Sequence, residues 1–207
     1  MSKADSGVLP VETKSIDTYV RKAWGREPTK NEWKLIVKRI QLLEWLNDIY
    51  PLELQSQDIK GNYTKLYPFG EVEMHAPAVY YRILPNELVF DIDCEDVKES
   101  FEVTKQIVNV LKTLGCKPAV GYSGNRGFHI HVIVTAEGVD PRDFAQGLYT
   151  KEWRNHLFEL ILSFLPENVV DYVDTGIIKA KAHTIRAFYS LNLKTMKWKQ
   201  FVKPCDQ

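Results

Sequence analysis

The chain has 207 residues, of which 44% are hydrophobic and 12% aromatic, so it can bury one sizeable core or two small lobes around a cleft. Lysine plus arginine balance aspartate plus glutamate at 27 each, which argues against indiscriminate coating of nucleic acid. No apolar run approaches the roughly 20 residues of a membrane span, and the start MSKADSGVLPVETKS lacks a secretory signal. The sequence therefore predicts a soluble, cytoplasmic protein with no membrane partner.

The three cysteines are odd in number and far apart, so neither a disulfide framework nor a structural zinc site is expected: Cys94, Cys116 and Cys205. The balanced total charge hides an asymmetry near the C-terminus. Between Thr175 and Pro204 the chain carries seven basic residues and no acidic one. We expect this basic segment to face phosphates.

The first half of the chain opens with two predicted helices, Ser15 to Trp24 and Thr29 to Asn47, the second beginning with a Thr29 and Glu32 capping pair. Residues 51–75 are rich in turn formers and are expected to be irregular. Two strands dense in β-branched and aromatic residues follow, joined at Pro85-Asn86: 77–84 and 87–93.

The second half alternates helices and strands. An amphipathic helix is predicted from Glu99 to Leu114, with Gly115 as its stop, and one or two more from Pro141 to Leu165 behind the capping residue Asp140. Strands are predicted at 118–123 and 128–134, and short strands again from Val169 on. This order predicts an α+β or split α/β class.

Helical spacing also predicts which side chains of the second and the last helix face inward. They are Trp33, Ile36, Val37, Ile40, Leu43, Leu46, Trp153, Leu157, Leu160, Ile161 and Phe164.

The first chemical feature is a pair of aspartates, Asp91 and Asp93, at the end of a strand. Because side chains alternate along a strand, both carboxylates project to the same face while Ile92 turns to the other. Carboxylates this close repel each other unless a divalent cation lies between them, and oxygen ligands favour Mg²⁺ or Mn²⁺ over zinc. The alternative is a surface turn with two solvated aspartates.

The second feature is the turn in GYSGNRGFHIHV, residues 121–132. Alternation assigns Phe128, Ile130 and Val132 to the core and turns His129 and His131 away from it. Two histidines on one strand face could bind zinc, but no third ligand is evident from spacing. With Ser123, Arg126 and the glycine-rich backbone, His129 would instead make a polyphosphate pocket. A plain hairpin with solvent-facing polar residues remains the simpler alternative.

Three segments in order, VFDID, YSGNRGFHIHV and VDTGIIKAKAHTIRAFYSLNLKT, resemble the motifs of the archaeo-eukaryotic primase superfamily. The pattern is closest to the catalytic small subunit of archaeal and eukaryotic primases, or to a minimal plasmid or viral primase-polymerase, and covers roughly residues 87–200. The resemblance implies a primase-type catalytic core with mixed β-sheets and flanking helices around a cleft. We place this core at 76–207, with 1–75 as an N-terminal segment packed on it.

The resemblance also implies which residues form the active site. Asp91, Asp93 and Asp174 match the catalytic, metal-binding carboxylates, because the third aspartate lies twelve positions before the basic residue Arg186; Asp171 is the competitor. The residues that match nucleotide-binding positions, or lie among them, are Ser123, Arg126, His129, His183, Arg186 and Lys194.

The sequence departs from the family pattern in three places. Asn192 and Met196 replace the histidine and glycine of the tail that contains Lys194. No cysteine-rich zinc segment follows Asp93. His131 has no role in the motif and is expected to be structural or peripheral.

The function implied is template-directed nucleotidyl transfer, the synthesis of RNA or DNA primers on single-stranded DNA from NTPs or dNTPs with two Mg²⁺ or Mn²⁺ ions. A template strand would contact the basic C-terminal segment, with stacking on Trp198 or the tyrosines near Tyr80. The resemblance allows a large primase subunit, further domains of a longer chain, or a helicase as partners, and an archaeal, viral or plasmid origin. The rival functions are a metal-dependent nuclease and a noncatalytic accessory subunit that binds nucleotide or primer-template.

Overall fold

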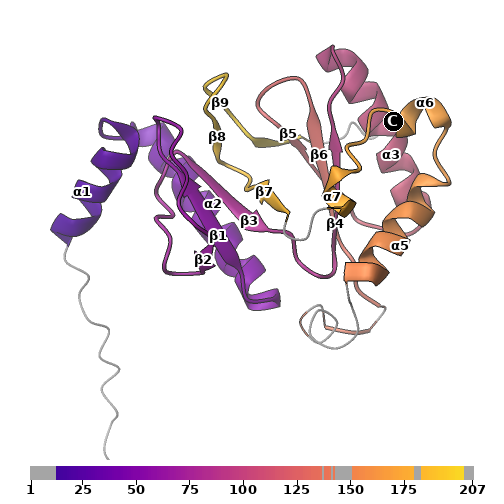
Figure 1. The fold of residues 1–207 in the computed structure, drawn as a ribbon, viewed down its shortest axis with the longest axis horizontal. Helices are drawn as coiled ribbons and strands as arrows, with labels where there is room; N and C mark the ends of the chain where they lie inside the picture. Colours follow the sequence, from indigo (N-terminus) through magenta and orange to yellow (C-terminus); the bar gives the residue numbers. More distant parts are fainter. Residues whose placement is uncertain (1–12, 137, 141, 143–150, 180–182, 203–207) are drawn as a thin grey trace, which may run out of the picture.

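The computed structural model describes residues 13–136, 138–140, 142, 151–179 and 183–202. Two four-stranded sheets organise this part of the chain, and every strand pair in them is antiparallel. Figure 1 shows α1, α2 and β1–β3 on one side and β4–β6 with α3 and α5 on the other, while β7–β9 lie between them. Helices and antiparallel sheets in one chain confirm the α+β class.

The first sheet has the strand order β2-β1-β3-β7, with β1 Glu53–Gln57, β2 Tyr67–Pro68, β3 Ala78–Arg82 and β7 Thr184–Arg186. The prediction that residues 51–75 are irregular is therefore wrong for β1 and β2, which form one edge of this sheet, and is confirmed for the rest of that stretch. Leu54 is the one apolar residue of β1, and β2 is only two residues long, so neither strand shows the alternation that a periodicity search detects.

Two helices precede the first sheet: α1, Thr13–Trp24, and α2, Lys30–Ile49. The predicted cap of α2 is confirmed: the Glu32 amide donates to the Thr29 side chain at 3.3 Å, and the Thr29 amide donates to the Glu32 carboxylate at 2.7 Å. Leu43, Leu46 and Ile49 of α2 pack on β1, β3 and β7 in one apolar cluster.

A buried arginine of α2 forms hydrogen bonds with the backbone near β3 and β7. Arg39 is fully buried, and its guanidinium donates to the carbonyls of Met74 and Ala76 at 2.6 Å, of Pro77 at 3.2 Å and of Tyr189 at 3.3 Å. These carbonyls belong to the entry into β3 and to the turn after β7. Burial lowers the pKa of Arg39 to about 9, so the side chain stays charged at neutral pH.

The second sheet has the strand order β10-β5-β6-β4, with β4 Glu87–Ile92, β5 Ala119–Tyr122, β6 Phe128–Ile133 and β10 Gln200–Val202. A separate hairpin pairs β8, Leu191–Asn192, with β9, Lys197–Trp198. The two strands predicted around Pro85-Asn86 exist, but β3 and β4 belong to different sheets. The chain thus crosses from one sheet to the other at this point, where the Asn86 side chain donates to the Val134 carbonyl at 3.0 Å.

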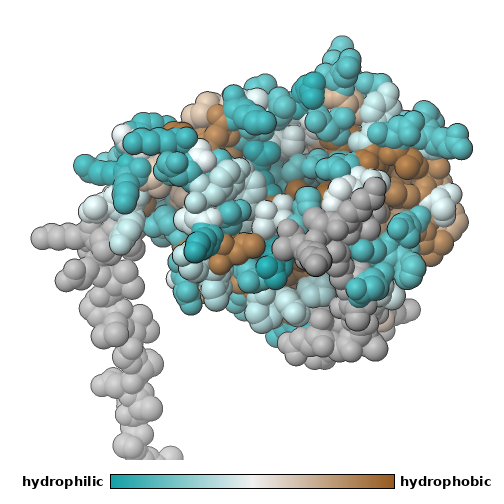
Figure 2. All heavy atoms as spheres, viewed as in Figure 1, coloured by the Kyte–Doolittle hydropathy of each residue, from teal (hydrophilic) through white to brown (hydrophobic). Residues whose placement is uncertain are grey.

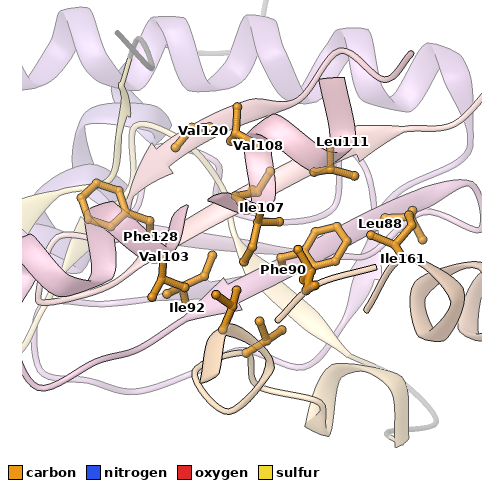
Figure 3. Close-up of a cluster of buried hydrophobic side chains, with 14 of the residues drawn as sticks. Leu88, Phe90, Ile92, Val103, Ile107, Val108, Leu111, Val120, Phe128 and Ile161 are labelled. Atoms are coloured by element: carbon orange, nitrogen blue, oxygen red, sulfur yellow. The ribbon is translucent and has the colours of Figure 1, made fainter. Parts of the chain in front are cut away.

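The main core lies between the second sheet and its helices α3, Val97–Thr113, α5, Lys151–Leu162, and α6, Glu167–Val170. Figure 3 shows the side chains that meet there from β4, β5, β6, α3 and α5. Leu88, Phe90 and Ile92 alternate inward from β4, so the residues between them turn to the opposite face. A last short helix, α7, spans Gly176–Lys179.

Some predicted details of the helices are wrong. Val37, Leu160 and Phe164 were expected to face inward, but they are 48%, 54% and 55% exposed, while Phe158 is buried and stacks on Phe90 at 4.6 Å between ring centroids. The predicted start at Pro141 lies outside the described residues, although Asp140 accepts a hydrogen bond from the Arg142 amide at 2.8 Å.

The face seen in Figure 2 is mostly hydrophilic, with hydrophobic residues gathered near α3 and α6. Among the helices in the described ranges, none combines the length and the apolar character that crossing a membrane requires.

Candidate active site

A pocket of about 550 Å³ lies where the two sheets approach each other. The first sheet contributes Tyr80 and Arg186, and the second contributes Asp91 and His129. The pocket wall contains eight of the nine residues predicted from the sequence: Asp91, Asp93, Ser123, His129, Asp174, His183, Arg186 and Lys194. The ninth, Arg126, lies next to it, with Nη2 3.5 Å from Oδ1 of Asp93.

Three carboxylates line the pocket near the end of β4. Ile92 is fully buried in the core, so Asp91 and Asp93 turn to the pocket, with side chains 30% and 60% exposed. Asp174 reaches them from a distant part of the chain because its amide donates to the Asp91 carbonyl at 2.9 Å, beside an antiparallel bridge between Ile92 and Val173. Asp171, the competing candidate, ends α6 and is not part of the pocket wall.

The pKa of Asp91 is raised to about 6. Burial is the largest cause, and the neighbouring carboxylates of Asp174 and Asp93 add to it, while Lys199 and Arg186 oppose it. The pocket thus gathers negative charge that its own cations only partly offset, and oxygen donors of this kind suit Mg²⁺ or Mn²⁺. In the described ranges, however, no three acidic, histidine or cysteine side chains are grouped closely enough to make a finished metal site.

The glycine-rich turn lies directly against these carboxylates. A Cβ on Gly127 would come within 2.0 Å of the Ile92 carbonyl oxygen, so only glycine allows the turn to approach the end of β4. Gly124 has a φ of +88°, and its carbonyl accepts a hydrogen bond from the Thr195 hydroxyl. The glycine-rich turn is therefore held at the pocket by two contacts, the close approach of Gly127 to β4 and the hydrogen bond of Gly124 to the β8–β9 hairpin.

His129 faces Asp91 across the β4–β6 pairing, with Nε2 3.4 Å from Oδ1. The strand alternation is as expected, but both histidines are buried in a second interior between the sheets, His129 being 5% and His131 6% exposed. Burial, and then the nearby cation of Lys199, lower the pKa of His129 well below its ordinary range. The pocket therefore contains a neutral imidazole at this position.

The position of Lys199 differs from the one expected for the basic C-terminal segment. It was expected to face phosphates with its neighbours, but it is fully buried, and its Nζ lies 2.8 Å from Nδ1 of His129. Lys194 is exposed at the pocket wall and remains available to an anion.

Arg186 joins the two sheets at the pocket. From β7 its Nη2 donates to the Ser123 carbonyl at 2.8 Å, so a residue of the first sheet holds the turn of the second. Burial lowers the pKa of the guanidinium, and Tyr80 and Asp91 oppose this. His183, just before β7, is half-buried, and burial lowers its pKa also.

Among the residues of the pocket wall that sequence reasoning missed are Gln57 and Tyr63, which come from the stretch expected to be irregular. The Tyr80 hydroxyl donates to Gln57 Oε1 at 3.0 Å, and the rings of Tyr63 and Tyr80 lie 5.6 Å apart. Trp198 is partly buried and stacks on Trp24 with ring centroids 6.0 Å apart, so this contact already occupies one side of its ring.

Comparison with known proteins shows the family and the fold of the chain. The model of the LigD primase-polymerase domain family matches residues 18–194. The fold is similar to that of the polymerase domain of Mycobacterium tuberculosis ligase D, solved in complex with DNA, with a TM-score of 0.57 over 84% of this chain and 81% of that one. The two sequences are 12% identical, so this likeness concerns the fold alone. No curated protein sequence matches the chain.

The family match spans the first two motifs, the third as far as Lys194, and most of both sheets. It also confirms the resemblance to the archaeo-eukaryotic primase superfamily, to which LigD polymerase domains belong. The chain belongs to the LigD primase-polymerase domain family and is a nucleotidyltransferase of the primase-polymerase type that acts on DNA.

Proposed function

We propose that the pocket between the sheets adds nucleotides to the 3′-hydroxyl of a strand paired to a single-stranded DNA template. The observation that carries this proposal is that three carboxylates and a set of anion-binding donors line one pocket. A nuclease needs the carboxylates but has no need of a glycine-rich turn with an arginine and a histidine.

Asp91, Asp93 and Asp174 would hold Mg²⁺ or Mn²⁺. Bound there, such ions lower the pKa of the attacking hydroxyl and neutralise charge on the triphosphate. The support is chemical: the donors are all carboxylate oxygens, and the pKa of Asp91 is raised by its two acidic neighbours as well as by burial. A cation in the pocket would relieve that repulsion.

The donors on the other side of the pocket would bind the triphosphate. His129 and Arg186 are held in place by buried contacts, and Arg126 and Lys194 add charge from its rim. They would hold the α-phosphate in line with the 3′-hydroxyl, since a fixed geometry lowers the entropic part of the barrier. The hydroxyl oxygen then bonds to the α-phosphorus, the bond from that phosphorus to the bridging oxygen breaks, pyrophosphate leaves, and the hydroxyl proton is lost to solvent.

DNA is the proposed partner because the M. tuberculosis domain of the same fold was solved with DNA bound. The template would pass the exposed basic residues of the C-terminal segment, among them Lys194 and Lys197. NTPs and dNTPs are both candidate substrates.

The test is extension of a labelled primer on a single-stranded DNA template with Mn²⁺ or Mg²⁺, with NTPs and dNTPs compared, and a parallel reaction without primer. Asp91→Ala and Asp93→Ala should each lower the extension rate by ~10³-fold, because metal ions supply several kcal/mol of charge stabilisation. Glu95→Ala, an exposed carboxylate just beyond the site, is the matched control and should retain the wild-type rate.

Wild-type extension by Asp93→Ala would contradict the metal assignment. Shortened strands in place of extended ones would favour a nuclease. Nucleotide binding without any product would favour an accessory subunit.

A further inference from the structure

A buried lysine lies behind the substrate-facing histidine and has no part in the function proposed above. Lys199 Nζ lies within hydrogen-bond distance of three groups: Nδ1 of His129 at 2.8 Å, Nε2 of His131 at 3.0 Å and the Arg186 carbonyl at 2.7 Å. In its ammonium form, which the inference below assigns to it, the side chain has three protons, one for each of these partners. A buried charge of this kind persists only where its hydrogen bonds and a counter-charge compensate for the loss of water.

Burial, and then the Arg186 guanidinium, lower the pKa of Lys199 well below its ordinary value, while the counter-charges Asp91 and Glu87 oppose this. Of these two counter-charges, Glu87 is the buried one, being 1% exposed. Its Oε1 accepts hydrogen bonds from the Tyr81 hydroxyl at 2.6 Å and from Nδ1 of His131 at 2.7 Å, and its Oε2 accepts one from the Leu84 amide at 3.2 Å. Burial alone would raise the pKa of Glu87, but these hydrogen bonds hold it below the ordinary value. The carboxylate is therefore ionised.

The ionised Glu87 determines where the proton of His131 lies. Since Nδ1 of His131 donates to the carboxylate, Nε2 of this neutral ring is left as an acceptor, and it faces Lys199. The Arg186 carbonyl can also only accept. Two protons of Lys199 thus have fixed destinations, and the third is directed at Nδ1 of His129.

That third hydrogen bond determines whether the nitrogen on the opposite side of the His129 ring, Nε2, has a proton. A neutral imidazole whose Nδ1 accepts has its proton on Nε2, the atom that faces Asp91 at 3.4 Å in the pocket. We propose that Lys199 is a positioning residue, which holds His129 in the tautomer that presents an Nε2–H donor to anionic oxygens in the pocket. The proposal rests on the proposed function, because it assigns His129 to the phosphates of the nucleotide.

The tautomer determines whether His129 donates or accepts a hydrogen bond when the substrate binds. An imidazole with the opposite tautomer would present a lone pair to the pocket and repel a phosphate oxygen. With Lys199 behind it, His129 is a donor before the nucleotide arrives, so no proton needs to move when the triphosphate binds.

The first test reads the tautomer directly in the protein without nucleotide. Long-range ¹H–¹⁵N spectra of ¹⁵N-histidine-labelled protein, with His129 assigned from a His129→Gln variant, should show the proton on Nε2 alone. Lys199→Met has a similar shape and no donor, and should turn this pattern into a mixture of the two tautomers while near-UV circular dichroism stays unchanged. A proton on Nδ1 in the wild type, or an identical pattern in folded Lys199→Met, would overturn the proposal.

The second test is a double-mutant cycle on the affinity for a non-hydrolysable α,β-methylene nucleoside triphosphate with Mg²⁺. His129→Ala and Lys199→Met should each weaken binding by about tenfold, and the double variant should be no weaker than His129→Ala alone. Additive losses would mean that Lys199 acts only on the fold.

Glu87→Gln keeps the shape of the network and provides a second variant if Lys199→Met does not fold. Glu87→Gln should weaken nucleotide binding by a few-fold in the wild-type background. It should have no effect in the His129→Ala background, and an effect there would count against the proposal. Because the spectra need neither nucleotide nor catalysis, a Lys199-dependent tautomer in a protein that extends no primer would disprove the proposed function and leave the positioning role intact.

Discussion

The two walls of the pocket are built in opposite ways. On the acidic wall, Asp93 and Asp174 are exposed, and Asp91 is disfavoured as an anion by its burial and its acidic neighbours. On the basic wall, His129 and Lys199 are buried and joined by a 2.8 Å hydrogen bond, and Arg186 is anchored to the turn. The hydrogen-bond donors are thus held in place before any ligand binds. The carboxylates, by contrast, lack the positive charge that a bound cation would supply.

The difference has a physical reason. Hydrogen-bond donors that stabilise a triphosphate are most effective when they need no rearrangement, so burying them in a network is useful. Carboxylates that hold a cation must instead remain open to solvent, because the hydrated ion has to enter and to shed part of its water. The two walls should therefore respond differently to substitution.

The largest expected effect separates Asp174, on the acidic wall, from Asp171, which lies outside the pocket. Asp174→Ala should lower primer extension by ~10³-fold, since it removes a proposed metal ligand, while Asp171→Ala should stay within about twofold of the wild type. Steady-state extension rates at saturating Mn²⁺ measure both. The reverse order would show that the competitor is the third carboxylate.

A smaller effect is expected on the basic wall. Arg186→Ala should raise the KM for nucleotide by about 10–100-fold, because it removes a charged donor and the anchor of the Ser123 carbonyl. Arg82→Ala is the matched control, as Arg82 lies on the adjacent strand and pairs with Glu53 at the surface. Equal losses in the two variants would mean that general positive charge, and not the anchored guanidinium, binds the nucleotide.

The smallest expected effect is a gain in stability on the acidic wall. The pKa of Asp91 rises from 3.8 in the unfolded chain to about 6 in the fold, so the folded state loses stability as pH increases from 4 to above 6. A rise of this size corresponds to at most ~3 kcal/mol, and a partly solvated site should retain about 1–2 kcal/mol of it.

Asp91→Asn should therefore be the more stable protein in urea unfolding at pH 7.5 by about 1–2 kcal/mol, and this gain should vanish at pH 4. Added Mn²⁺ should stabilise the wild type and leave Asp91→Asn unaffected. If Asp91→Asn were less stable than the wild type at pH 7.5, the negative charge of Asp91 would already be balanced by the protein's own groups, without a cation.

Much of the fold followed from the sequence because its elements have strong local patterns. The capping residues of α2 and the alternation in β4 and β6 predicted those elements and the faces they bury. The strands β1 and β2 were not predicted because β1 depends on β3, and β2 on β1, for hydrogen bonds, and because neither strand has much periodicity of its own.

The site was predictable where a motif keeps its residues close in sequence, as in Ser123 to His129. The contribution of Gln57 was not, because only the first sheet brings it beside Tyr80. Lys199 was misjudged because its charge suggested a surface residue, and nothing local indicates that three acceptors from β6 and β7 surround its ammonium.

The stretch from β7 to β10 also bears on how the chain folds. β7 pairs with β3, and β10 pairs with β5, so residues 184–202 add the last strand to each sheet after the other strands have been synthesised. Until then one side of β3 and one side of β5 lack their strand partners, and unpaired strand edges are templates for aggregation. Translation that stalls before residue 184 should thus yield a product that is both inactive and prone to association, and a chaperone would have most to protect at that moment.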